Sequence, residues 1–92
     1  MIPESWVEQH GYSTHSLSHS TFYAKIPSGG SIPPHGDDAP NRKNTVLEGS
    51  GILTVAGESR RISKGDAYRF DSIAIHEVQN DGDCDLIILV EP

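Results

Sequence analysis

The sequence predicts an all-β protein, and three observations support this prediction. After Gly11, no segment has the sustained 3.6-residue periodicity of apolar residues that an amphipathic helix requires. Short runs rich in branched and aromatic residues recur instead, separated by glycine, proline, asparagine and aspartate at intervals of roughly 8–12 residues. The 92 residues suffice for one domain. We therefore expect one barrel or sandwich of about seven or eight short strands.

The N-terminal segment is open to two interpretations. Residues 3–11 begin with a proline and an acidic residue and end at Gly11, which is typical of one or two helical turns. The alternative is an extended arm that crosses to a partner subunit, with Trp6 and Val7 as its anchors. Residues 12–20 are rich in serine, threonine and histidine, which indicates a loop or an irregular edge. We assign residues 1–20 to an N-terminal arm and residues 21–92 to the barrel.

The strands of the barrel follow from their composition and from the turns between them. The expected strands are 21–26, 31–34, 45–48, 52–55, 59–62, 67–70, 73–78 and 86–90. Residues 56–58 are predicted to join two of them in a hairpin, and Asn80–Asp83 predicts another hairpin before the last strand. The longest apolar run, Leu86 to Val90, is typical of a buried strand and too short to span a bilayer.

Charge and cysteine content exclude several function classes. The formal net charge is −6, and basic residues form only short groups at 42–43 and 60–64, which argues against binding to nucleic acid or anionic membranes. Cys84 is the only cysteine, so neither an internal disulfide nor a cysteine-based zinc site is expected. The first residues lack the basic start and apolar middle of a secretory signal, so a cytoplasmic protein is the default expectation.

Two spaced patterns of glycine and polar residues lie between residues 29 and 80. The spacing G-x5-H-x-H-x4-E-x6-G is matched in register by Gly29, His35, Asp37, Arg42 and Gly49. The spacing G-x5-P-x-G-x2-H-x3-N is matched by Gly65, Asp71, Ile73, His76 and Asn80. These are the spacings of the two cupin motifs, so the sequence resembles the cupin family. The resemblance implies a cupin-type double-stranded β-helix, or jelly-roll barrel, with a short N-terminal arm or helix.

The resemblance also implies a metal site, with two departures from the usual ligands. His35 and His76 occupy two of the four ligand positions of the family, whereas Asp37 stands at the position of the second histidine and Arg42 at that of the glutamate. If residues 35–37 are extended, His35 and Asp37 share one face. Two histidines and a carboxylate suit Fe, and they also accept Mn, Zn or Ni. We therefore predict that His35, His76 and Asp37 bind a divalent metal.

Arg42 introduces an alternative, because a guanidinium is always charged and cannot bind a metal. It can pair with Asp37 or hold an anionic small-molecule ligand through its two parallel donors. We predict a substrate-binding role for Arg42, Tyr68 and Phe70, the two aromatic residues as pocket walls. The remaining histidines, at positions 10, 15 and 19, are expected to be exposed.

The leading functional hypothesis is a small stand-alone cupin that binds one divalent metal, with an unknown reaction. The alternative from another class is a non-catalytic sensor or binding module for a carboxylate or sugar acid. A narrower resemblance is to the 2-oxoglutarate and iron oxygenases related to aspartyl/asparaginyl β-hydroxylases, and it is carried by Pro34-His35, Asn41-Arg42, Arg69–Ser72, His76–Val78 and Asn80. That resemblance implies that His35 and His76 hold iron and that Arg42 approaches the 2-oxoglutarate carboxylate. A homodimer is expected, because a second copy can cover the exposed edges of so small a barrel.

Overall fold

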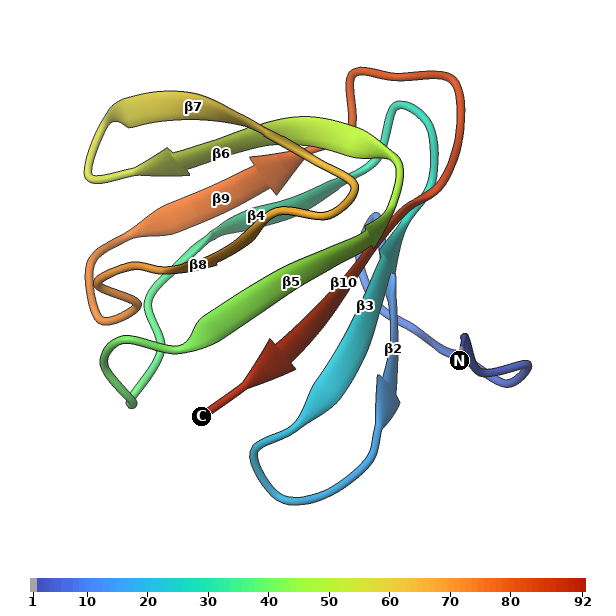
Figure 1. The fold of residues 1–92 in the computed structure, drawn as a ribbon, viewed down its shortest axis with the longest axis horizontal. Helices are drawn as coiled ribbons and strands as arrows, with labels where there is room; N and C mark the ends of the chain where they lie inside the picture. Colours follow the sequence, from blue (N-terminus) through green and yellow to red (C-terminus); the bar gives the residue numbers. More distant parts are fainter. Residues whose placement is uncertain (1) are drawn as a thin grey trace.

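The computed structural model describes residues 2–92, and within them every regular element is a β-strand (Figure 1). The strands are β1 (Val7–Glu8), β2 (Ser13–Ser16), β3 (Phe22–Ile26), β4 (Ser31–His35), β5 (Lys43–Glu48), β6 (Ser50–Val55), β7 (Glu58–Ser63), β8 (Ala67–Arg69), β9 (His76–Gln79) and β10 (Leu86–Glu91). This confirms the all-β prediction.

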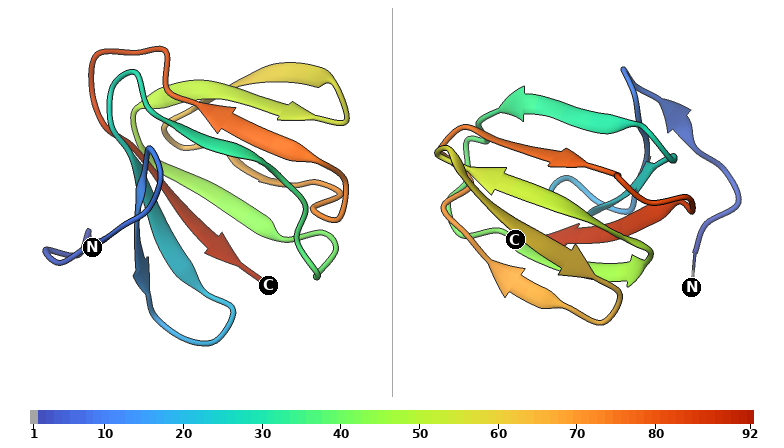
Figure 2. Two further views of the ribbon diagram at one scale, coloured as in Figure 1. Left: turned by 180° about the vertical axis from the view of Figure 1, so that it is seen from behind. Right: turned by 90° about the horizontal axis from the view of Figure 1, so that it is seen from above.

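The strands form two antiparallel sheets. One has the order β1-β2-β3-β10-β5-β8 and the other the order β4-β9-β6-β7. Neighbours in each sheet are mostly far apart in the sequence, and the two sheets face each other across the interior of the molecule (Figures 1 and 2). This arrangement is the predicted jelly-roll barrel. The hairpin at residues 56–58 is also confirmed, since β6 pairs with β7 from Val55 and Glu58 onward.

The core lies between the two sheets. Its fully or almost fully buried apolar residues come from six strands and comprise Ile26, Val46, Leu53, Ile62, Val78, Leu86, Ile88 and Val90. Strand β10 contributes most because it lies between β3 and β5. That position explains why residues 86–90 form the longest apolar run in the sequence. Burial of each Leu or Ile side chain stabilises the barrel by about 1.5–3 kcal/mol.

The helical interpretation of residues 3–11 is wrong: the segment is extended and pairs within its own chain, and its predicted crossing to a partner subunit stays a prediction. Strand β1 pairs with β2, and β2 pairs with β3, so the N-terminal segment continues the larger sheet. The backbone groups of β1 pair with β2, and those of β2 with the edge of β3, whereas an isolated helix of this length would be only marginally stable. Trp6 packs within the chain, with the Lys25 ammonium 4.5 Å from the centroid of its ring, and Val7 is 64% exposed. The homodimer stays a prediction.

Residues 73–75 were predicted to begin a strand but form a turn instead. The Asp71 carboxylate accepts a hydrogen bond from the Ile73 amide at 3.3 Å, and the Asp71 carbonyl accepts one from the Ala74 amide at 3.2 Å. These bonds end the extended conformation, so β9 begins only at His76. Ile73 and Ile75 consequently lie on the surface, 55% and 62% exposed.

The hairpin predicted at Asn80–Asp83 is also wrong, because β9 and β10 belong to different sheets. The segment crosses from one sheet to the other, and Asn80 fixes this crossing. Its buried side chain donates to the carbonyls of Ile26 and Cys84 at 2.8 and 2.7 Å and accepts from the Gly82 amide at 3.0 Å. Asn80 therefore closes one end of the barrel.

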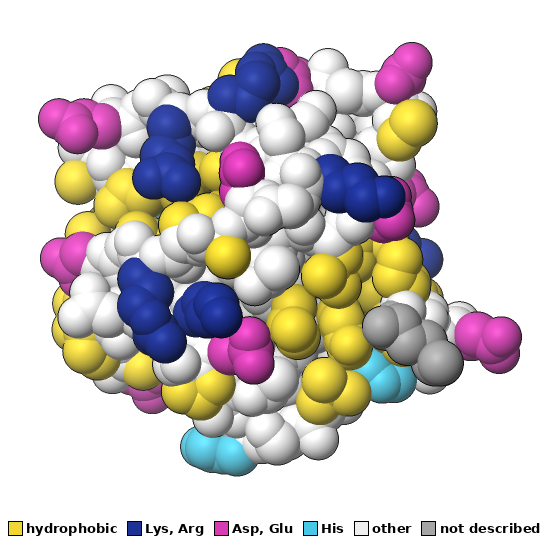
Figure 3. Space-filling view, in the orientation of Figure 1, with side chains coloured by type: hydrophobic (Ala, Val, Ile, Leu, Met, Phe, Trp, Pro, Cys, Tyr) yellow, Lys and Arg dark blue, Asp and Glu magenta, His cyan; other side chains and the backbone are white. Residues whose placement is uncertain are grey.

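Basic side chains on the surface lie among acidic ones, as the face in Figure 3 shows. Arg61 forms a bidentate pair with Asp81 at 2.7 and 3.2 Å, and Lys64 lies 3.2 Å from the carboxylate of Glu48. Two of the three basic residues in the second basic group of the sequence are thus paired with acidic side chains. Among residues 2–92, no helix has the length and apolar character needed to cross a membrane.

Candidate metal centre

The fold brings His35 and His76 together, although forty-one positions separate them in the sequence. His35 is the last residue of β4 and His76 the first of β9, and the two are direct cross-strand partners. The centroids of their rings lie 4.4 Å apart. His76 is only 5% exposed, whereas the His35 side chain is 42% exposed, so the pair reaches from the interior to the mouth of the barrel.

The backbone sets the same tautomer in both histidines. His35 Nδ1 lies 2.8 Å from the carbonyl oxygen of Pro33, and His76 Nδ1 lies 2.8 Å from that of Ala74. A carbonyl oxygen can only accept, so Nδ1 carries the proton in each ring. In a neutral imidazole this leaves the lone pair on Nε2, the arrangement found in histidines that bind metals.

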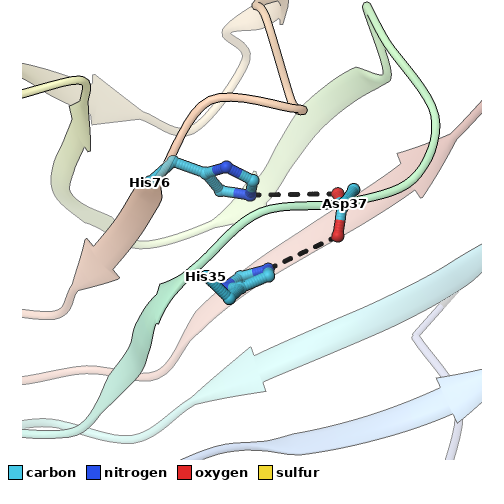
Figure 4. Close-up of side chains that lie close together, drawn as sticks. All are labelled: His35, Asp37 and His76. Carbon is cyan, nitrogen blue, oxygen red and sulfur yellow. Dashed lines mark ion pairs between the residues drawn. The ribbon is translucent and has the colours of Figure 1, made fainter.

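Asp37 lies in the loop after β4 and faces both imidazoles (Figure 4). Its Oδ1 lies 3.5 Å from His35 Nε2, and its Oδ2 lies 3.8 Å from His76 Nε2. Each of the three residues offers one potential ligand atom, and these three atoms lie within 4.8 Å of one another. The three residues predicted as ligands are therefore adjacent, with their donor atoms converging.

The loop that carries Asp37 is fixed by the turn before β9. The Asp37 amide donates to the Ser72 carbonyl at 2.7 Å. The Ser72 hydroxyl is fully buried, donates to the Ala39 carbonyl at 2.6 Å and accepts from the Arg42 amide at 3.3 Å. Gly36 approaches this turn so closely that an added Cβ would lie 2.6 Å from the Ile73 carbonyl oxygen. The turn thus holds Asp37 beside the two histidines.

Arg42 lies beside Asp37 and away from the open part of the site. Its side chain is 13% exposed, its Nε lies 3.8 Å from Asp37 Oδ2, and its Nη1 donates to the Ser20 carbonyl at 3.2 Å. The pairing with Asp37 that the sequence suggested is therefore present. Arg42 is not among the residues that line the cavity.

A cavity of about 380 Å³ opens beside the three residues, within the size range of small-molecule sites. Its apolar wall consists of Tyr12, Phe22, Ala24, Ile32, Phe70, Val78, Ile88 and Val90. Its polar lining consists of Gln9, Thr14, Ser16, Asn44, His35, Asp37 and His76. Phe70 stands edge-on to His76 with ring centroids 4.9 Å apart. Tyr68 packs behind Phe70, under the Arg60 guanidinium, and does not line the cavity.

With this geometry established, comparison with known proteins identifies the family. The family model described as "Cupin domain" matches residues 22–90, which is most of the chain. The chain belongs to the cupin family. This confirms the resemblance carried by the two motifs. Cupins commonly bind divalent metals.

Solved structures similar to this cupin have varied descriptions. A predicted oxalate decarboxylase from Thermotoga maritima is 28% identical, with a TM-score of 0.69, over 76% of this chain and 61% of that one. A candidate sugar phosphate isomerase from Acidithiobacillus ferrooxidans is 27% identical, with a TM-score of 0.71, over 86% and 56%. The cupin domain of Cnp3 from Schizosaccharomyces pombe is 17% identical, with a TM-score of 0.79, over 89% and 64%.

The chain spans less than two thirds of each of these three proteins. No curated protein matches the sequence significantly. The comparisons therefore establish the cupin fold and family.

Two site residues of this cupin were not found from the sequence. In the sequence, nothing distinguishes Ser72 from other loop serines. Its role depends on its contacts with Ala39 and Arg42, which only the fold creates. Asn44 is 6% exposed and lines the cavity from β5. A signal for Asn44 was available, because a polar residue two positions before the buried Val46 shares its face of the strand.

The donor set of this cupin fits a divalent cation. The two Nε2 atoms and the Asp37 carboxylate converge, with 3.5 and 3.8 Å between each nitrogen and a carboxylate oxygen. Three protein ligands leave positions free for a bound molecule. His35, Asp37 and His76 would hold the cation, which would act as a Lewis acid on a ligand oxygen.

Proposed function

We propose that this cupin binds one divalent metal ion through His35, Asp37 and His76 and uses it to hold a small ligand in the adjacent cavity. The observation that carries the proposal is the tautomer of the two histidines. Because Nδ1 of each ring donates to a backbone carbonyl, two lone pairs face one carboxylate. These electron-rich atoms would repel one another without a positive charge between them.

The roles of the surrounding residues follow from their contacts. The carbonyls of Pro33 and Ala74 orient the imidazoles, and the Ser72 turn orients Asp37. Arg42 keeps a positive charge 3.8 Å from Asp37 Oδ2. Phe70 packs against the buried face of His76 and shields it from water. A metal held in this way can polarise a carboxylate, carbonyl or hydroxyl oxygen of a ligand.

The test is metal binding by the purified, metal-free protein. We expect isothermal titration with Zn²⁺ and with Mn²⁺ to give one site per chain. We also expect the metal to raise thermal stability, by about 2.7 kcal/mol at a hundredfold excess over the dissociation constant. His35→Ala and Asp37→Asn should weaken binding strongly. His19→Ala and Asp38→Asn, which change exposed residues outside the cavity, are the matched controls.

Two outcomes would contradict the proposal. One is the absence of stoichiometric binding for Zn²⁺, Mn²⁺, Ni²⁺ and Fe²⁺ alike. The other is binding that persists in His35→Ala and Asp37→Asn but is lost when histidines of the N-terminal segment are replaced.

The metal-free anion-binding alternative has less support. In the described part of the chain, no lysine or arginine lines the cavity, and Arg42 is engaged by Asp37 and the Ser20 carbonyl. The same contacts give no support for Arg42 as a 2-oxoglutarate ligand. An oxalate decarboxylase-like or sugar phosphate isomerase-like reaction is suggested by two of the similar structures.

A further inference from the structure

Strand β2 presents polar side chains to the cavity, whereas the neighbouring strand β3 presents apolar ones (Figure 1). Successive side chains of a strand point to opposite faces, and from β2 the cavity is lined by Thr14 and Ser16. From β3 it is lined by Phe22 and Ala24. Thr14 is partly exposed and Ser16 is exposed, so a bound molecule can reach this part of the wall.

The other side chains of β2 face away from the cavity and anchor the strand. Ser13 donates to the Glu8 carboxylate at 3.1 Å. The ring of His15 lies 6.3 Å from that of Trp6 and 6.3 Å from that of Tyr23, measured between centroids. Together with the pairing of β2 and β3, these contacts hold the strand through its outer face. The cavity-facing side chains are therefore held in place and open to a ligand.

The other accessible, uncharged polar groups of the cavity also come from the N-terminal segment. The Gln9 amide lines the cavity and donates to Thr14 Oγ1 at 3.2 Å, which leaves the proton of that hydroxyl for another acceptor. Asn44 lines the cavity too, but its side chain is buried beside Tyr68. The family model covers residues 22–90, which include all three candidate metal ligands. The polar wall of residues 9–16 thus lies outside it.

We propose that residues 9–16 select the ligand. The ligand carries an uncharged group that both donates and accepts hydrogen bonds, a hydroxyl or a carboxamide, and this group binds at Thr14 and Ser16. A serine or threonine hydroxyl donates one hydrogen bond and accepts two, which suits such a group. A second anionic group would lack a counter-charge, because no lysine or arginine among residues 2–92 lines the cavity. The inference rests on the proposed metal site, which holds the other end of the ligand.

Hydroxamates provide the test, because their head group binds Zn²⁺ and their tail can be varied. Calorimetric titration of the Zn²⁺-loaded protein compares alkyl hydroxamates of three to six carbons with their ω-hydroxy and ω-carboxy counterparts. At the length that reaches β2, we expect the hydroxyl to tighten binding about fivefold, the gain typical of one neutral hydrogen bond. A hydroxyl that brings no gain at any length, or ω-carboxy tails that bind more tightly than ω-hydroxy tails, would overturn the inference.

Variants on the two faces of β2 locate the effect. The double variant Thr14→Val and Ser16→Ala removes both hydroxyls with little change of shape, so the preference for the hydroxyl tail should disappear while Zn²⁺ affinity stays the same. Ser13→Ala removes a hydroxyl from the opposite face of the same strand and should keep the preference. A preference that survives in the double variant would show that the contact lies elsewhere. If the double variant does not fold, Ser16→Ala at its exposed position should still reduce the preference.

Failure of this inference can be told apart from failure of the proposed function. If Zn²⁺ binds at His35, Asp37 and His76 but the hydroxyl tail gives no preference, ligand selection by β2 is wrong and the metal site stands. If Zn²⁺ does not bind to the unaltered protein, the proposed metal site is wrong, and the inference falls with it.

Discussion

The turn at Ser72 offers a sharp test of how the barrel holds its site. Ser72→Ala removes a fully buried hydroxyl and leaves the backbone unchanged. Two hydrogen bonds are lost, one to the Ala39 carbonyl at 2.6 Å and one from the Arg42 amide at 3.3 Å. At about 1 kcal/mol for each bond, the free energy of unfolding should fall by about 2 kcal/mol. In a domain of this size, that corresponds to a loss of roughly 8–16 °C in Tm.

Urea unfolding followed by far-ultraviolet circular dichroism measures this change. The midpoint should fall while the slope with denaturant stays the same, because the surface exposed on unfolding is unchanged. Ser59→Ala is the matched control, since the Ser59 hydroxyl shares an exposed hydrogen bond of 2.7 Å with Thr54. That variant should lie within about 0.5 kcal/mol of the unaltered protein. A loss below that value for Ser72→Ala would refute the role given to the turn.

The same variant has a second readout, which rests on the proposed metal site. A looser loop holds Asp37 less firmly, so Zn²⁺ affinity should fall about tenfold, as for other groups that orient metal ligands. Ser59→Ala should leave that affinity unchanged. A loss of stability without a loss of metal affinity would make Ser72 a purely structural residue.

Three further predictions follow from particular contacts. Gly49→Ala should cost roughly 2 kcal/mol or more, because φ is +80° and the added Cβ would lie 2.4 Å from the Asp85 carbonyl oxygen. Gly57→Ala, at a φ of +84° in open space, should cost only the backbone strain, and equal urea midpoints for the two would contradict the clash. The Arg61 guanidinium lowers the pKa of Asp81 below 3.8, so the stabilisation by this pair is present above about pH 4 and lost as the pH falls through the lowered pKa. In Arg61→Ala, a carbon-detected NMR titration should show that pKa rising, and an unchanged value would exclude the pair in solution. Burial raises the pKa of Tyr68 above 10.0, and a hydrogen bond with Asn44 and the charge of Arg60 lower it by less. The stability that the neutral Tyr68 side chain contributes is therefore lost as the pH rises through the raised pKa. Tyr68→Phe should therefore weaken the alkaline loss of stability in urea unfolding. An alkaline loss as large in Tyr68→Phe as in the unaltered protein would show that Tyr68 does not cause it.

The strands could be predicted because their signals are local. Each signal depends on a few neighbouring residues: the alternation of apolar residues, glycine at turns and the long apolar run at 86–90. The structure has a strand in almost every predicted range. The errors occurred where distant contacts decide the outcome. Ile73 and Ile75 are typical strand residues, yet the Asp71 turn exposes them. Residues 80–83 resemble a hairpin turn, yet Asn80 bonds to Ile26 across the barrel.

The candidate ligands could be predicted from the spacing of the motifs, whereas the contacts that orient these ligands could not. His35, Asp37 and His76 fall on motif positions, and the fold brings them together. The carbonyls that set the imidazole tautomers belong to Pro33 and Ala74. Every residue has a backbone carbonyl, so the sequence does not indicate which carbonyls make these contacts. Asn44 and Ser72 act through a cavity wall and a loop contact that exist only after folding.

The two departures from the usual cupin ligands are explained together by the geometry. Arg42 stands at the usual glutamate position and Asp37 at a usual histidine position, and the two lie 3.8 Å apart. The carboxylate of this site thus comes from the loop directly after β4, and a guanidinium occupies the usual glutamate position, just before β5. Asp37 Oδ2 is shared between Arg42 and His76, whereas Oδ1 faces His35. A metal bound here would have three protein ligands instead of four, and its nearest carboxylate would be partly neutralised. Such a site retains more positive charge at the metal, which favours an anionic ligand that completes the coordination.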